Sequence, residues 1–127
     1  MSKQSPERLF LTFLRIAFVG CLVALAVLSW LPATAMTRST LGGHAEHFVA
    51  YLGTTTVMGL AFQRRPHLAV QCALLIAYAA ILEMGQLYSP GRSASFQDFA
   101  FSSSGVIVGC LLVLMARGRL SSWFKIN

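Results

Sequence analysis

The chain has 127 residues, of which 56% are hydrophobic and only 11% are charged. Soluble domains carry roughly 25% charged residues, and so short a chain cannot bury this much apolar surface in a fold surrounded by water. The formal charge of +6 comes from residues at the ends of apolar stretches, not from a basic patch, which argues against nucleic-acid binding. The composition therefore predicts one membrane-embedded domain with the lipid bilayer as its partner.

Four apolar stretches approach the roughly 20 residues that an α-helix needs to cross a bilayer. Each ends at proline, glycine or arginine, residues that stop or flank membrane helices. Helices are favoured over barrel strands because the apolar runs are nearly continuous, whereas barrel strands alternate in polarity. We expect an all-α domain over 9–116 with spans at 9–31, 45–62, 67–88 and 98–116, between tails at 1–8 and 117–127.

The Lys and Arg residues in the flanks predict the orientation of these spans, because cytoplasmic segments are enriched in them. One side of the membrane would receive eight of these residues, and the other side only Arg38 and Arg92. The eight are Lys3, Arg8, Arg15, Arg64, Arg65, Arg117, Arg119 and Lys125. Both termini are therefore predicted to lie in the cytoplasm, which agrees with an even number of spans.

The first span has an alternative interpretation as a cleavable signal peptide. Basic residues precede it, and Ala33-Thr34-Ala35 is similar to an A-x-A cleavage site. Its apolar run is longer than the roughly 7–15 residues of a signal-peptide core. Retention of the span is the favoured interpretation, and cleavage stays open.

Polar side chains that could bind a ligand or transfer a proton gather at the predicted outer ends of the second, third and fourth spans. They are His44, Glu46, His47, Glu83, Gln86, Arg92, Asp98 and Ser102. At about 100° per residue, His44, His47 and Tyr51 share one stripe of the second helix. Glu46 points to another side and suits the positive end of the helix dipole. Crossing a membrane does not require this gathering, so it marks a candidate binding site or buried polar network.

Glu83 is predicted to lie about 7–8 Å inside the third span, where a bare carboxylate costs a few kcal/mol. Such a group must be protonated, hydrated or paired with a cation. Arg92 is held close by the short connection 89–97 and is the expected partner, and Asp98 is a second carboxylate that could pair with it.

The fourth span carries small residues on the same stripe as its polar ones. Gly105 and Gly109 have the small-xxx-small spacing that is common where helices pack in lipid. Asp98 and Ser102 share this stripe. We therefore expect it to face the polar residues of the second and third spans.

His44, Glu46 and His47 are not expected to bind a metal, because only two of them share a stripe and zinc normally has three or four ligands. The cytoplasmic halves of the spans contain no series of polar residues that could continue a proton or ion pathway from the outer carboxylates, which argues against transport through a single chain. The sequence therefore predicts neither a metal nor another cofactor.

The order and spacing of the polar residues resemble the VanZ-like family of small bacterial membrane proteins. The resemblance covers about half of the chain and is carried by His47-Phe48-x-x-Tyr51, Glu83-x-x-Gln86-x-x-x-Pro90-x-Arg92, Asp98, Gly105 and Gly109. The family commonly has an Asp-Lys pair and an Asn where this chain has Gly43-His44 and Ser102. The resemblance implies a multi-pass protein of the bacterial inner membrane, a role in the cell envelope and a link to resistance against the glycopeptide teicoplanin. It specifies no reaction.

Three functions are compatible with these residues. The outer site could bind an anionic lipid or cell-wall precursor, with the guanidinium of Arg92 meeting phosphate or carboxylate. Alternatively, the polar cluster could brace the helices of a structural or accessory protein. A membrane-embedded transferase or hydrolase, with His47 as general base, is less favoured, and no catalytic residue is assigned. The sequence leaves open whether the chain acts alone, as a homodimer or with another membrane protein.

Overall fold

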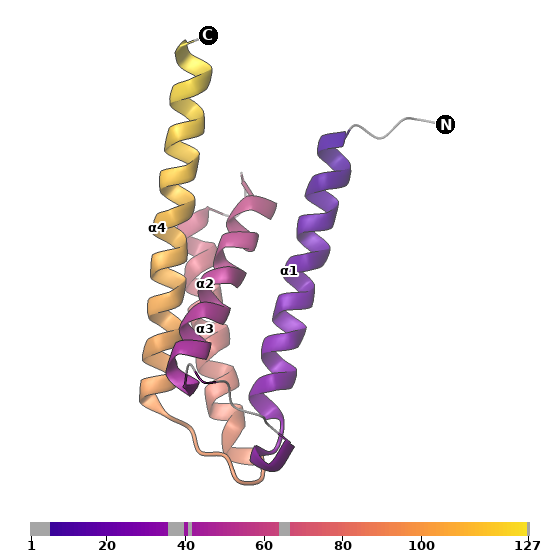
Figure 1. Cartoon of the computed structure of the whole chain (residues 1–127), viewed down its shortest axis with the longest axis vertical. Helices are drawn as coiled ribbons and strands as arrows, with labels where there is room; N and C mark the ends of the chain where they lie inside the picture. Colours follow the sequence, from indigo (N-terminus) through magenta and orange to yellow (C-terminus); the bar gives the residue numbers. More distant parts are fainter. Residues whose placement is uncertain (1–5, 36–39, 41, 64–66, 127) are drawn as a thin grey trace, which may run out of the picture.

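The computed structural model describes residues 6–35, 40, 42–63 and 67–126, with side chains described as far as 119. Its elements are α1 (Pro6–Trp30), η1 (Ala33–Ala35), α2 (Gly43–Ala61), α3 (Leu68–Gly85), η2 (Gln86–Tyr88) and α4 (Phe96–Ile126). The predicted all-α fold with four helices is confirmed (Figure 1). Four charged residues used to predict the orientation, Lys3, Arg38, Arg64 and Arg65, lie outside the described residues.

Three of these helices are long and apolar enough to cross a membrane, namely α1, α3 continued through η2 to Tyr88, and α4 as far as Arg119. The 19-residue α2 is not among them, because its sequence begins with two histidines and a glutamate and contains three consecutive threonines. Length and composition therefore support three of the four predicted spans. Whether α2 also crosses depends on how its polar groups are satisfied.

The threonines of α2 are satisfied within their own helix. The hydroxyl groups of Thr54, Thr55 and Thr56 each donate a hydrogen bond of 2.7–2.9 Å to the carbonyl oxygen four residues earlier. A hydroxyl bonded in this way no longer needs water. These three residues therefore present little obstacle to the burial of α2 in an apolar environment.

The packing of α2 against α4 is the most extensive between any two elements. Two glycines of α4 allow the backbones of the two helices to approach closely. A Cβ on Gly105 would collide with the carbonyl oxygen of Phe48, and a Cβ on Gly109 would lie 2.8 Å from the Cβ of Thr55. This approach of the two backbones brings the first turns of α2 and α4 together.

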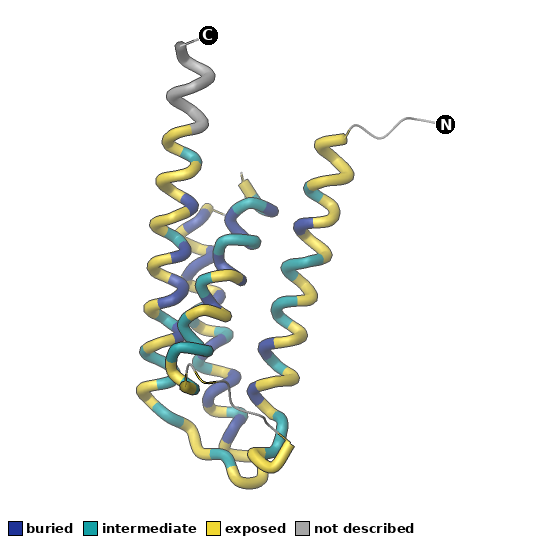
Figure 2. Tube along the Cα trace, in the orientation of Figure 1, coloured by how far each residue is buried: buried dark blue, intermediate teal, exposed yellow. Residues whose placement is uncertain are grey.

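The first helix, α1, is the most loosely attached one, and much of its surface is exposed (Figure 2). Exposed apolar side chains such as Ile16 suit contact with lipid tails. Two hydrogen bonds connect α1 with α3. The Tyr78 hydroxyl donates to the Leu22 carbonyl oxygen at 2.7 Å, and Trp30 Nε1 donates to the Leu82 carbonyl oxygen at 3.4 Å.

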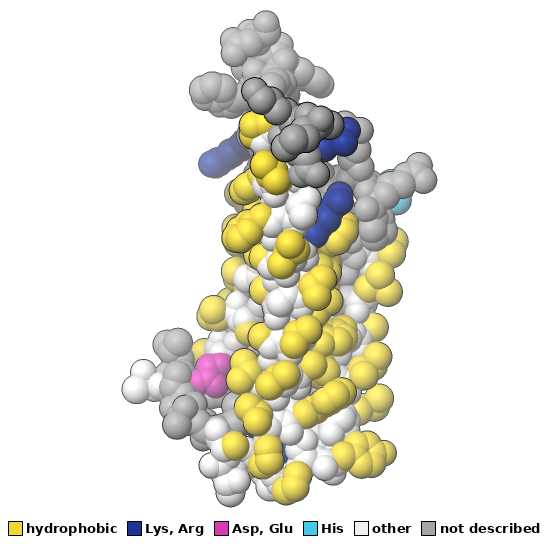
Figure 3. Space-filling model, turned by 90° about the vertical axis from the view of Figure 1, so that its right-hand side faces the viewer, with side chains coloured by type: hydrophobic (Ala, Val, Ile, Leu, Met, Phe, Trp, Pro, Cys, Tyr) yellow, Lys and Arg dark blue, Asp and Glu magenta, His cyan; other side chains and the backbone are white. Residues whose placement is uncertain are grey.

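The start of α1 and the end of α4 lie at the same end of the bundle (Figure 1), and Lys and Arg side chains gather towards this end (Figure 3). α4 continues as helix beyond 116, where the sequence predicted the end of a span. The arginines there limit the apolar stretch without ending the helix. Arg117 donates hydrogen bonds to the carbonyl oxygens of Gly59 and Phe62 and so caps the last turn of α2.

Candidate functional site

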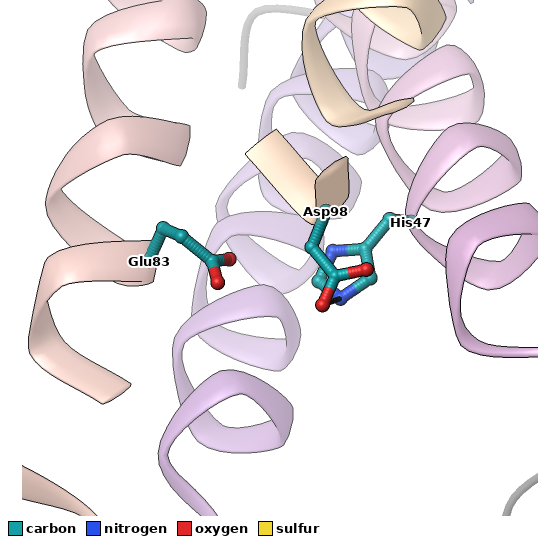
Figure 4. A group of neighbouring side chains, drawn as sticks. All are labelled: His47, Glu83 and Asp98. Atoms are coloured by element: carbon teal, nitrogen blue, oxygen red, sulfur yellow. Dashed lines mark ion pairs between the residues drawn. The ribbon is translucent and has the colours of Figure 1, made fainter. Parts of the chain in front are cut away.

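Three polar side chains from three helices meet at the end of the bundle opposite the termini. His47 lies near the start of α2, Glu83 near the end of α3 and Asp98 in the first turn of α4. Figure 4 shows the three side chains pointing into one space between the helices. One nitrogen or oxygen atom from each lies within 4.8 Å of those of the other two. We call these three residues the His–Glu–Asp cluster.

Glu83 is buried, with 7% of its surface exposed, and is held by hydrogen-bond donors. Its Oε1 accepts a 2.6 Å hydrogen bond from the backbone N–H of Ser95. Its Oε2 accepts a longer one, of 3.4 Å, from Nε2 of Gln86. Gln86 is itself 3% exposed and belongs to η2, which follows α3 directly.

Arg92 lies in the loop before α4, and the expected ion pair with Glu83 or Asp98 is not formed, since the ion pairs of the described residues join Asp98 to histidines. Its guanidinium donates instead to the carbonyl oxygens of Ser29, at 3.0 Å, and Leu28, at 3.4 Å. These carbonyls belong to the last turn of α1, where a helix exposes unpaired acceptors and a partial negative charge. The end of α1 therefore supplies hydrogen-bond acceptors to the guanidinium of Arg92.

Ser95 was absent from the predicted site, yet it contacts the carboxylate of Glu83 and the backbone of Asp98. Its hydroxyl accepts a 3.3 Å hydrogen bond from the N–H of Asp98, as an N-cap residue does. In a capping box, the carboxylate three residues later would bind the N-cap N–H in return. Here Glu83 of α3 binds that N–H, so the side chain of Asp98 is left to face α2. The spacing Ser95-x-x-Asp98 was the sequence signal for this cap.

The Asp98 carboxylate contacts both histidines of α2. Its Oδ1 lies 2.6 Å from Nδ1 of His44, and its Oδ2 lies 3.9 Å from Nε2 of His47. The ring of His44 also stacks on Phe101, with 5.1 Å between the ring centroids. Nδ1 of His47 is 3.2 Å from the hydroxyl of Ser102. Both histidines therefore face α4 from one stripe of α2, as the helical phase predicts.

The other predicted site residues lie deeper in the bundle. Tyr51 is 2% exposed and belongs to the apolar core. Gly105 and Gly109 form the contact between α2 and α4, as described above. These three residues support the polar end of the bundle from within and are absent from the walls of its polar pocket.

A polar pocket of about 260 Å³ opens beside the His–Glu–Asp cluster. Its walls come from η1, the start of α2, η2, the loop before α4 and the first turn of α4. They include His44, Glu46, His47, Gln86, Arg92, Ser95 and Asp98. Glu46 lines this pocket together with the histidines, although helical phase assigned it to another side. The pocket extends around the first turn of α2, so side chains from adjacent sides of the helix reach it.

Comparison with protein-family models, with curated proteins and with solved structures gave no match. The resemblance to the VanZ-like family therefore stays a prediction from the spacing of polar residues. The apolar helices indicate a multi-pass protein of a lipid bilayer. Within it, the His–Glu–Asp cluster, with Glu83 buried and His47 and Asp98 half-buried, lies beside a polar pocket at one end of the bundle.

Proposed function

We propose that the chain is a VanZ-like protein of the bacterial inner membrane that binds an anionic lipid-linked or cell-envelope ligand. The observation that supports this most is the polar pocket at the end of the bundle opposite the termini. Arg92 and the imidazoles of His44 and His47 lie in its walls and offer hydrogen-bond donors suited to phosphate or carboxylate oxygens. With both termini in the cytoplasm, the pocket opens at the outer face.

This topology requires that α2 crosses the membrane together with the other three helices. Its close packing on α4 and the internal hydrogen bonds of its threonines support the crossing. Reporter fusions after Thr40, Pro66 and Ser93 are expected to lie outside, inside and outside. If α2 stayed on one side, the fusions after Thr40 and Pro66 would report the same compartment.

Arg92→Ala is expected to abolish the function while the protein still accumulates in the membrane. A deletion strain complemented with wild type, Arg92→Ala or Arg92→Lys would be compared for envelope lipids and for susceptibility to glycopeptides. We expect Arg92→Ala to match the deletion strain and Arg92→Lys to recover part of the function, because lysine keeps the charge but not the planar fork of donors. Arg8→Ala, at an exposed arginine of α1, is the matched control and is expected to match wild type.

A structural or accessory role is the second candidate, and the hydrogen bonds of two residues favour it. Arg92 donates to carbonyls of α1, and Glu83 accepts from the backbone of Ser95, so both tie separate elements together. In that case Arg92→Ala would lower the abundance of the protein in parallel with function. The amount of membrane-inserted protein, measured in the same strains, separates the two candidates.

A further inference from the structure

We propose that the His–Glu–Asp cluster is a binding site for one divalent cation of the Zn²⁺ or Mn²⁺ type. One imidazole nitrogen and two carboxylate oxygens form a donor set that suits these ions. The ligands would be His47 of α2, Glu83 of α3 and Asp98 of α4 (Figure 4). Helical phase within α2 could not reveal this set, because each ligand comes from a different helix.

The distances are close to those that coordination requires. The three candidate donor atoms lie within 4.8 Å of one another. With metal–ligand bonds of about 2.0–2.2 Å, donors around a tetrahedral ion lie roughly 3.4 Å apart. Side-chain rotations that close the group by about 1–1.5 Å would therefore complete the site without moving the helices.

Neighbouring groups hold each of the three ligands and orient it towards the cluster. His47 has Nδ1 beside the hydroxyl of Ser102, and its Nε2 faces Asp98 Oδ2 at 3.9 Å. Glu83 has Oε1 bound by the N–H of Ser95 at 2.6 Å, and its Oε2 accepts only the longer hydrogen bond of 3.4 Å from Gln86, so Oε2 is the more weakly held oxygen. Groups that orient ligands in this way are typical of metal sites.

Asp98 is held in the same manner, since His44 binds its Oδ1 at 2.6 Å and leaves Oδ2 turned towards His47. Carboxylates that bind a metal are themselves commonly hydrogen-bonded by neighbouring groups. Four residues outside the cluster thus maintain its geometry, namely His44, Gln86, Ser95 and Ser102.

The charge at this end of the bundle also favours a cation. Two carboxylates lie together. Asp98 contacts the imidazoles of His44 and His47, whereas Glu83, which is 7% exposed, is held by hydrogen bonds from Ser95 and Gln86. Carboxylates withdrawn from water need compensating positive charge. A divalent ion between Glu83 and Asp98 would supply it.

Three protein ligands leave at least one coordination position open, as in catalytic zinc sites. His47 and Asp98 also line the polar pocket, so the open position would face it. A phosphate or carboxylate oxygen in the pocket could then complete the coordination. This last step rests on the proposed ligand-binding function, whereas metal binding itself does not.

The test is metal titration of the full chain, purified in detergent with an affinity tag that contains no histidine and stripped with chelator. Zn²⁺ and Mn²⁺ are titrated separately, and bound metal per chain is measured by mass spectrometry together with the Tm. We expect one ion per chain and a higher Tm for the wild type. Glu83→Gln and Asp98→Asn keep the shape of each side chain, and each is expected to weaken binding by at least the roughly 10–100-fold typical of second-layer changes.

Glu7→Gln and His67→Ala are matched controls, since both residues are exposed and lie outside the cluster. They are expected to bind metal as the wild type does. The inference is overturned if the wild type binds no ion stoichiometrically, or if Glu83→Gln and Asp98→Asn bind as tightly as the controls. If those two variants lose their helical circular dichroism, the metal affinity of Ser102→Ala is measured instead. An affinity equal to that of the wild type would also overturn the inference. The titration contains no envelope ligand, so its failure is distinct from failure of the cell-based assay with Arg92→Ala.

Discussion

Gly105→Ala is expected to destabilise the bundle by about 1–3 kcal/mol, the usual cost of overpacking a well-packed contact. The added Cβ would collide with the carbonyl oxygen of Phe48 and lie 3.1 Å from the backbone nitrogen of Leu52. Both atoms belong to the backbone of α2, so no side-chain rotation relieves the contact. Separation of α2 from α4 would also draw His47 away from Asp98.

Gly53→Ala is the matched control for this change. Gly53 lies in the same pair of packed helices, but a Cβ there would meet nothing within 4 Å. Alanine is favoured over glycine in a helix by up to about 1 kcal/mol, so we expect equal or slightly higher stability. The Tm in detergent and the abundance in the membrane measure both variants. Equal Tm values for Gly105→Ala and Gly53→Ala would contradict the packing described for α2 and α4.

Glu83→Ala is expected to cost about 1–3 kcal/mol, because it leaves the backbone N–H of Ser95 without its acceptor in a partly buried position. The first turn of α4 would lose its attachment to α3, and Asp98 would lose its fixed orientation with it. Faster hydrogen exchange at Ser95–Asp98, together with a lower Tm, is the expected result.

Glu83→Gln separates the role of Glu83 as a hydrogen-bond acceptor from the effect of its negative charge, since the amide oxygen of glutamine can still accept the hydrogen bond from the N–H of Ser95. We expect it to retain most of the stability that Glu83→Ala loses. Glu7→Ala, at the exposed start of α1, is expected to leave both measurements unchanged. If Glu83→Ala were as stable as Glu83→Gln, the hydrogen bond from Ser95 would not hold α4 in place.

The helices could be predicted from the sequence because the length of an apolar stretch is a local property. The same property predicted a membrane span for α2. Two histidines, a glutamate and three threonines make this helix less apolar, and only the other three helices are long and apolar enough to cross a membrane. The phase of α4 is local too. It placed Gly105 and Gly109 on the stripe of Asp98 and Ser102, and this stripe faces α2 in the structure.

The partners of long or flexible side chains could not be predicted in this way, because they depend on which donors and acceptors the fold brings near. Arg92 reaches the carbonyl of Ser29, 63 residues earlier in the chain. Glu83 accepts from the backbone of a cap residue that no charge pattern distinguishes.

The sequence by itself determined that this is an apolar, helical chain whose polar residues gather at a few helix ends, because composition and helical phase follow from residue order alone. Only the tertiary structure decided which atoms of the converging residues His47, Glu83 and Asp98 lie near one another, and that Arg92 binds carbonyl oxygens of α1. The physical reason is that the distances between helices depend on packing at small residues such as Gly105. Those distances decide which polar groups can satisfy one another away from water.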